Sequence, residues 1–201
     1  INSPWGLQRI FPKRLWHKSR ETKKVYITFD DGPIPNVTPW VLEQLERHEA
    51  KATFFCIGDN VKKHPEVFQQ IKSEGHVIGN HTQNHLNGWK TANKTYIQNV
   101  HDCAASINQL FLSSETSLRK ENQSITSQSS SLLFRPPYGK LKSNQAKQLI
   151  SKGYKIVMWD VLSADFDQDV SEEKCLENVL NNVQNGSIVV FHDSLKAERN
   201  L

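Results

Sequence analysis

Residues 25–33 read Val-Tyr-Ile-Thr-Phe-Asp-Asp-Gly-Pro, so that an apolar run ends in two adjacent carboxylates and a Gly-Pro turn. The apolar run predicts a β-strand. Two neighbouring carboxylates repel each other unless a cation lies between them or a hydrogen bond relieves one of them. The pair Asp30 and Asp31 therefore suggests a metal ligand beside a catalytic base, and the remaining ligands must come from elsewhere in the chain.

Short apolar runs alternate with amphipathic stretches along the chain, a pattern typical of βα units with a parallel sheet. The predicted strands cover 25–29, 52–57, 76–79, 132–134, 155–159 and 187–191, and the predicted helices cover 38–48, 65–74, 95–111, 143–152 and 171–183. Thr38 is expected to cap the first helix, and Gly75 and Gly153 are expected to end two others.

Length and composition exclude several classes of protein. The 201 residues are enough for one domain with a substantial core. The net charge of +4 is mild, and no block of Lys and Arg is interleaved with aromatic residues, which argues against a nucleic-acid site. No apolar run approaches the ~18 residues that a transmembrane helix needs. Three cysteines are too few for a disulfide framework, and Cys56 is expected in the core.

The expected organisation is a basic segment over 1–24 followed by a catalytic domain over 25–201. Within that domain, the Ser-rich stretch 113–131 is expected to be a flexible surface insertion. The chain stops nine residues after His192, where a barrel would continue, so the natural protein is expected to extend further. The sequence predicts neither the cellular location nor the oligomeric state.

Unusual polar residues follow almost every predicted strand. Asp30 and Asp31 follow the first strand, His81 and His85 the third, Arg135-Pro136-Pro137-Tyr138-Gly139 the fourth, Trp159 and Asp165 the fifth, and His192 and Asp193 the sixth. The carboxyl ends of parallel strands share one face of the fold, and this face carries the active site. These side chains are therefore expected to converge at one rim.

His81 and His85 are four residues apart, and on a helical turn this spacing places both imidazoles on one side. Together with one carboxylate they supply three protein ligands and leave coordination positions open. Such an arrangement is typical of catalytic rather than structural metal sites. Zn²⁺ suits these N and O ligands best, with Co²⁺, Ni²⁺ or Fe²⁺ as alternatives.

Five segments in this order resemble the motifs of the NodB-homology polysaccharide deacetylases, carbohydrate esterase family 4. They are Thr-Phe-Asp-Asp-Gly-Pro, His-Thr-x-x-His, Arg-Pro-Pro-Tyr-Gly, the segment around Asp165, and Val-Phe-His192. The similarity spans 25–193. It implies a TIM-like, distorted (β/α) barrel of six to seven parallel strands. It also implies metal-dependent hydrolysis of linear amide bonds, with release of acetyl groups from N-acetylated sugars of a chitin-oligosaccharide or peptidoglycan type of glycan.

The resemblance also assigns roles by position. It implies Asp31, His81 and His85 as metal ligands, Asp30 as general base, His192 as general acid and the backbone N–H of Tyr138 as oxyanion donor. Hydrolysis of an amide needs each of these functions, because the carbonyl resists neutral water and the amine leaves poorly unless it is protonated.

Arg135 and Asp165 are expected to form a pair that orients Asp30. The fourth motif departs from the family pattern, since Leu162 and Phe166 stand where the family commonly has an Asp and a Trp. Asp160 and Asp167 therefore remain alternative partners for Arg135. Among the aromatic residues nearby, Trp159 is expected in the core rather than as a platform for sugars, whereas Trp89 could flank the cleft or lie in a surface loop.

Three other functions fit part of the pattern. An O-acetyl esterase acting on acetylated xylan could use the same site. A non-haem iron oxygenase also uses two His and one carboxylate, but it leaves Asp30, Arg135 and His192 without a role. A non-catalytic sugar-binding relative would not need the complete set of catalytic side chains that is present here.

Overall fold

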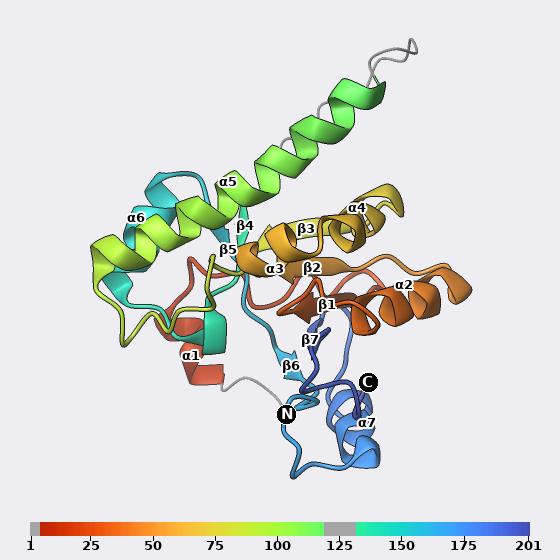
Figure 1. Ribbon diagram of the computed structural model, residues 1–201. Coiled ribbons are helices and arrows are strands. Elements are labelled where there is room, and N and C mark those ends of the chain that lie inside the picture. The colour runs from red at the N-terminus through yellow and green to blue at the C-terminus, as the bar shows by residue number, and fades with distance from the viewer. Residues whose placement is uncertain (1–4, 119–131) are drawn as a thin grey trace.

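A computed structural model describes residues 5–118 and 132–201 of the chain. In these residues seven parallel strands form one sheet in the order β5-β4-β3-β2-β1-β7-β6, which curls into a half-barrel (Figure 1). The strands are β1 Tyr26–Asp30, β2 Thr53–Cys56, β3 Val77–Asn80, β4 Leu133–Phe134, β5 Lys155–Ile156, β6 Val161–Leu162 and β7 Ile188–His192. The prediction of a distorted barrel of six to seven parallel strands is confirmed.

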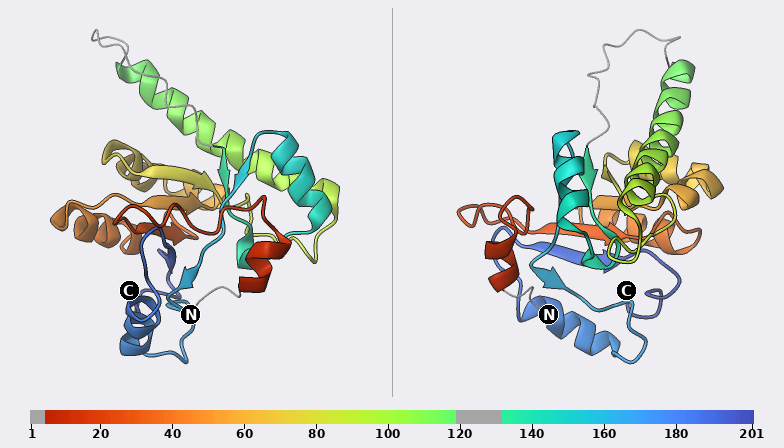
Figure 2. Two further views of the ribbon diagram at one scale, coloured as in Figure 1. Left: turned by 180° about the vertical axis from the view of Figure 1, so that it is seen from behind. Right: turned by 90° about the vertical axis from the view of Figure 1, so that its left-hand side faces the viewer.

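Among the described residues the helices lie outside the sheet, and all except α1, which precedes β1, connect one strand to the next. They are α1 Trp5–Ile10, α2 Val37–Arg47, α3 Gly58–Lys63, α4 Pro65–Ser73, α5 Asn93–Leu118, α6 Ser143–Ser151 and α7 Glu172–Leu180, with a 3₁₀ turn η1 at Pro137–Gly139. Helix α5 packs against α3 and α6, and its far end extends away from the rest of the molecule (Figure 2). None of the helices in the described ranges has both the length and the apolar character that crossing a membrane requires.

The structure departs from the predicted helices in ways that bear on the site or the insertion at α2 and α5. Helix α2 begins at Val37, so Thr38 lies inside its first turn and is not the N-cap. Its hydroxyl instead accepts a hydrogen bond from the Ile34 N–H and donates one to Asp193. Helix α5 continues to Leu118, so the start of the predicted insertion is helical, and the remainder of the insertion, 119–131, lies outside the described residues. Glycines at positive φ follow α4 and α6, as predicted.

The core is built from apolar residues on both sides of the sheet. Between the sheet and α2 to α5 the buried residues include Phe29, Leu42, Phe54, Cys56, Phe68, Ile71 and Ile107. A second cluster near α5 and α6 includes Trp16, Tyr96, Phe134, Leu149, Ile156 and Met158. Burial of each large side chain contributes about 1.5–3 kcal/mol. The core position predicted for Cys56 is confirmed, and its thiol is free.

The segment before β1 connects strands from both halves of the sheet. Leu15 pairs in parallel with Val157, just after β5, and His17 pairs with Ser187, just before β7. Leu15 N–H donates to the carbonyl oxygen of Ile156 at 2.8 Å, and its own carbonyl accepts the N–H of Met158 at 2.7 Å. Residues within the predicted basic segment therefore form part of the barrel wall, while the division of the chain at residue 24 stays a prediction.

Candidate active site

The side chains that follow the strands gather around one cavity at the carboxyl rim of the sheet. The cavity has a volume of about 290 Å³, and its lining residues include Asp30, Asp31, His81, His85, Tyr138 and His192. Arg135 and Asp165 lie beneath this lining and are completely buried. The structure thus brings all eight predicted site residues into one region.

Asp31 is placed to share a metal ion with two imidazoles. Its Oδ1 atom lies 3.1 Å from His85 Nε2 and 3.6 Å from His81 Nε2. The three candidate ligand atoms all lie within 4.8 Å of one another, and Oδ1 is a buried atom without a hydrogen-bond partner among the described residues. Burial raises the pKa of Asp31, but the contact with His85 and the charges of His81 and His192 outweigh it and hold this pKa well below its usual range.

The protonation state of His81 shows why a cation fits here. Its Nδ1 lies 2.8 Å from the carbonyl oxygen of Arg135, which can only accept, so Nδ1 carries the proton. Burial is the main cause that lowers the pKa of His81 to about 4, so the ring is neutral at pH 7. The lone pair of Nε2 then faces the carboxylate of Asp31. Two lone pairs in this position repel, and a divalent cation between them would convert the repulsion into coordination.

The loop that carries His81 and His85 is not helical, so the predicted helical turn is wrong. Thr82 and His85 have φ angles of 66° and 56°, and these left-handed positions turn the chain back on itself. The Asn80 side chain accepts the N–H of Thr82, and the Asn99 side chain of α5 accepts the next two N–H groups. The ring centroids of the two histidines are thereby held 5.1 Å apart.

A buried carboxylate holds the turn that presents Asp31. Asp193 Oδ1 accepts the N–H of Gly32 at 3.0 Å, and Oδ2 accepts the hydroxyl of Thr38 at 2.7 Å. A Cβ atom at Gly32 would overlap the Asp193 carboxylate, so only glycine fits there. Burial raises the pKa of Asp193 to about 8, although these two hydrogen bonds lower it. Asp193 thus supports the metal-ligand turn and is not among the residues that line the cavity.

Arg135 holds Asp30 from inside the barrel. Its Nη1 atom lies 2.7 Å from Asp30 Oδ1 and 2.7 Å from Thr28 Oγ1, and its guanidinium stacks on the Phe55 ring at 4.2 Å. Two more hydrogen bonds run to the carbonyl oxygens of residues 157 and 158. Burial lowers the pKa of Arg135, and Asp30 raises it. Thr28 was missed in the sequence, although it lies two residues before Asp30 and therefore points to the same face of β1.

Asp165 binds His192 and not Arg135, so the predicted Arg135–Asp165 pair is wrong. Asp165 Oδ1 lies 2.8 Å from His192 Nδ1, and Oδ2 accepts the backbone N–H of His192 at 2.6 Å. Ser163, which was also missed in the sequence, donates its hydroxyl to Asp165 at 2.9 Å. The reason is topological. Asp165 follows β6, which is paired with β7, whereas Arg135 follows β4 and reaches Asp30 through the barrel interior.

The other candidates for pairing with Arg135 have different positions. Asp160 forms an ion pair with Arg20 at 2.8 Å, and Asp167 is exposed.

The pKa of His192 is raised to about 9. Burial lowers this pKa, but the hydrogen bond and the charge of Asp165, together with the charges of Asp30 and Asp31, outweigh the effect of burial. His192 is therefore an imidazolium at neutral pH in this arrangement.

Aromatic side chains border the cavity. Tyr138 has a φ of 60°, and its ring lies over His85 with 4.6 Å between centroids. Trp159 packs partly against the core, as expected, but it also lines the cavity. Phe166 is half exposed and lies edge-on to His192 at 5.0 Å. The cavity therefore presents flat apolar surfaces next to its charged groups.

Comparisons with known proteins agree with this geometry. The family profile described as polysaccharide deacetylase matches residues 17–157. A peptidoglycan-N-acetylglucosamine deacetylase of Bacillus cereus is 34% identical over 171 residues, which are 85% of this chain and 56% of that relative. A chitooligosaccharide deacetylase of Azorhizobium caulinodans is 35% identical over 176 residues, which are 87% of this chain and 76% of that relative.

A solved structure shows the same fold at comparable identity. It is the crystal structure of a peptidoglycan N-acetylglucosamine deacetylase in complex with 4-naphthalen-1-yl-N-oxidanyl-benzamide. It aligns with a TM-score of 0.79 and 32% identity, covering 92% of this chain and 79% of that chain. The family match, the relatives and the shared fold confirm the resemblance found in the sequence: the chain belongs to the polysaccharide deacetylase family.

Proposed function

We propose that this chain hydrolyses N-acetyl groups of a glycan that contains N-acetylglucosamine, with a divalent metal ion held by Asp31, His81 and His85. The observation that supports this most strongly is the buried Asp31 oxygen that faces two imidazole nitrogens at 3.1 Å and 3.6 Å. The relatives named for peptidoglycan and for chitooligosaccharides indicate the type of glycan. The bound metal ion supplies positive charge that polarises the amide carbonyl and makes water easier to deprotonate.

Asp30 acts as the general base. Arg135 holds one of its carboxylate oxygens at 2.7 Å, which leaves the other oxygen to accept a proton from the attacking water. The buried guanidinium also keeps the carboxylate in one orientation toward the cavity. Arg135 is therefore a positioning residue, and the proton moves to Asp30.

Tyr138 supplies the oxyanion donor through its backbone. The turn at φ 60° lies on the wall of the cavity, and none of the backbone hydrogen bonds found within the described ranges uses the Tyr138 N–H. An N–H group without an internal acceptor can donate to the oxygen on which negative charge develops during attack.

His192 acts as the general acid. Asp165 binds its Nδ1 atom, so the other ring nitrogen is left to deliver a proton to the departing amine. The imidazolium is the form present at neutral pH, because the pKa of His192 is raised to about 9. Proton donation matters here because an amide nitrogen leaves poorly as an anion.

Acetate release tests this proposal. The purified protein is incubated with N-acetylglucosamine oligomers, peptidoglycan glycan strands or acetylated xylan, each with Zn²⁺, Co²⁺, Ni²⁺ or Fe²⁺ added separately. We expect metal-dependent release of acetate from the N-acetylated glycans and little from the xylan. The metal that gives the highest turnover then identifies the preferred cofactor.

Each other outcome points to a different function. Release from acetylated xylan alone would identify an O-acetyl esterase. Glycan binding without release under every metal condition would identify a non-catalytic sugar-binding protein. Turnover that requires both oxygen and 2-oxoglutarate would identify an iron oxygenase.

A further inference from the structure

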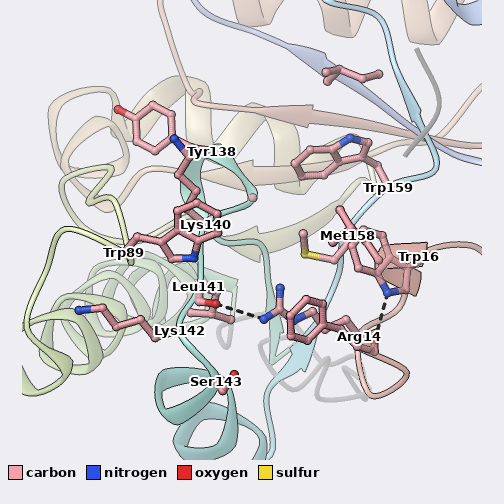
Figure 3. Close-up of a pocket in the computed structure, with 14 residues that line it drawn as sticks. Arg14, Trp16, Trp89, Tyr138, Lys140, Leu141, Lys142, Ser143, Met158 and Trp159 are labelled. Carbon is pink, nitrogen blue, oxygen red and sulfur yellow. Dashed lines mark hydrogen bonds between the residues drawn. The ribbon is translucent and has the colours of Figure 1, made fainter. Parts of the chain in front are cut away.

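A second, larger cavity adjoins the catalytic one. Its volume is about 500 Å³, within the range of small-molecule sites. The two cavities share the wall formed by Tyr138, Gly139, Lys140, Trp159 and Leu162. From that wall the second cavity extends toward Arg14 and Trp16, as Figure 3 shows. A polymer bound at the catalytic cavity can therefore continue into the second one.

The lining of this second cavity is basic. It includes Arg14, Lys140 and Lys142, and none of the described residues that line it is acidic. We call it the basic cavity, and its defining residues are Arg14, Trp16, Trp89, Lys140, Lys142 and Trp159. The charge distribution favours an anionic occupant over a neutral or cationic one.

Arg14 is buried in the wall of the basic cavity with few partners for its charge. The residue is only 7% exposed, and within the described residues its guanidinium makes a single hydrogen bond, from Nη2 to the carbonyl oxygen of Leu141 at 3.2 Å. Its Nε atom is buried without a partner, and no carboxylate of the described chain forms an ion pair with it. Buried charges are normally paired, because an uncompensated one is costly. The ring of Phe11 lies 4.1 Å below the guanidinium and fixes its plane.

Aromatic residues give the basic cavity the surface that a sugar ring requires. Trp89 is 61% exposed, and the Lys140 ammonium lies 5.6 Å from its ring centroid. Trp159 lines the same cavity, and Figure 3 shows it well apart from Trp89. Flat apolar faces together with a few fixed charges are the usual composition of a ligand site. An acidic sugar has both a ring face that can pack against the aromatic side chains and a negative charge that can pair with the basic ones.

We propose that the basic cavity binds a sugar that carries a carboxylate and lies next to the N-acetylglucosamine being deacetylated. Arg14 and Lys140 bind the carboxylate, and Trp89 packs against the ring. The substrate is then an acidic glycan rather than neutral chitin. This inference rests on the proposed function, since it takes the adjoining cavity as the catalytic one.

Binding can be measured separately from turnover. Zinc-loaded Asp30→Asn protein is titrated calorimetrically with four tetrasaccharides. One alternates N-acetylglucosamine with N-acetylmuramic acid, one is its carboxamide, one contains N-acetylglucosamine alone, and one alternates N-acetylglucosamine with glucuronic acid. We expect an acidic glycan to bind about tenfold more tightly than its neutral counterpart, in line with a charge-assisted hydrogen bond. The acidic glycan that binds more tightly shows which carboxylate the cavity prefers: the ether-linked one of N-acetylmuramic acid or the one attached to the ring of glucuronic acid.

Charge-neutralising variants, made in the same Asp30→Asn background, locate the effect. Lys140→Gln and Arg14→Gln are each expected to remove most of the preference for the acidic glycan and to leave binding of the neutral one unchanged. Lys147→Gln, an exposed position on α6 outside the cavity lining, is the matched control and should keep the full preference. Arg14 also holds the Leu141 carbonyl, so Lys140→Gln decides the outcome if Arg14→Gln fails to fold.

Two results would overturn the proposal: equal affinity for the acidic and neutral glycans, or an equal loss for both in Lys140→Gln. Acetate release by the wild-type enzyme separates this failure from failure of the proposed function. If acetate is released but charge has no effect on binding, only the basic cavity is wrongly assigned. If binding depends on charge but no glycan releases acetate, the anionic site stands and the proposed function fails.

Discussion

The carboxylate of Asp165 accepts hydrogen bonds from both the ring and the backbone N–H of His192, at 2.8 Å and 2.6 Å. The ring bond stabilises the protonated imidazole, and the backbone bond fixes the end of β7. Asp165 therefore favours the protonated form of His192, the proposed general acid. The sequence had suggested Asp165 as a partner of Arg135 instead. We expect the consequence to appear in the pH dependence of activity.

Asp165→Asn is expected to shift the alkaline limb of the pH profile. The wild-type limb should follow the pKa of His192, about 9, because activity is lost as the general acid deprotonates. Without the charge of Asp165 the limb should move toward the ordinary value of about 6.5, so that at pH 8 deprotonation alone lowers kcat/KM roughly 30-fold. The profile of kcat/KM from pH 5 to 10 measures this shift. Asp167→Asn is the control, and an unmoved limb in Asp165→Asn would refute the assigned role.

The same pair should affect stability in a defined pH window. A histidine whose pKa is raised in the folded state binds its proton more tightly there, so its stabilising contribution is complete below the unfolded value of 6.5. That contribution is lost as the pH rises through about 9. The free energy of unfolding in urea should therefore fall over this window in wild type. Asp165→Asn should show a smaller fall, and an equal fall in both proteins would contradict the linkage.

Asp30→Asn and His81→Ala are expected to fail in different ways. Asp30→Asn removes the base but none of the three candidate metal ligands, so the protein should keep its metal and lose about 10²- to 10⁴-fold in kcat. His81→Ala removes a ligand, so the metal itself should be lost on dialysis. Metal content by mass spectrometry and acetate release, measured on the same samples, separate the two defects. Near-full activity of Asp30→Asn would show that another group is the base.

Metal removal is expected to lower the melting temperature. Without a cation the neutral His81 ring and the Asp31 carboxylate oppose each other, 3.6 Å apart. A ligand at a hundred times its Kd stabilises the folded state by about 2.7 kcal/mol, so chelation should reverse a gain of this order. Differential scanning calorimetry with EDTA and with added Zn²⁺ measures the change. The melting temperature of His81→Ala should change with neither addition. An unchanged melting temperature of the wild-type protein would argue against the metal site.

Asp193 should control stability through the turn at Gly32. Asp193→Ala leaves the buried Gly32 N–H without its acceptor, which should cost about 1–3 kcal/mol, with a further loss at Thr38. Asp193→Asn keeps an acceptor and removes the titration. Because the pKa of Asp193 is raised from 3.8 to about 8, the wild-type protein should lose stability relative to Asp193→Asn as the pH rises toward 8. Urea unfolding at pH 5 and pH 8 tests both statements, with the exposed Asp169→Asn as control.

Much of the site could be predicted from the sequence because most of the strands are followed by polar residues at their carboxyl ends. The parallel order brings Asp30, Asp31, His81 and His192 to one rim whatever the details of the loops. The strand pattern and the five ordered segments were therefore sufficient for the fold and for the metal-ligand candidates. The pairing within the fourth segment was not predictable in the same way, because several aspartates lie close together between Trp159 and residue 169. Which of them faces His192 depends on the pairing of β6 with β7, and β6 is only two residues long.

The conformation of the loop that carries the two histidines and the presence of the basic cavity could not be predicted from the sequence either. Four-residue spacing suggested a helical turn, whereas left-handed positions at Thr82 and His85 produce the same convergence with a different backbone. Arg14 is buried because of the position of the segment before the first strand. The composition of that segment indicated only that it is basic. Its place in the wall comes from pairing between residues more than a hundred positions apart, which local patterns do not encode.

The pairing of β1 has a consequence for biosynthesis. Its register joins Tyr26 to Ile188 and Asp30 to His192, so β1 receives one of its two neighbours in this sheet only when β7 has been made. Until then the nascent sheet exposes an open edge beside β1, and such edges favour association with other chains. Contacts between residues this distant in sequence also slow folding. We therefore expect folding to be completed late, after translation of β7, with chaperones shielding the exposed edge during synthesis.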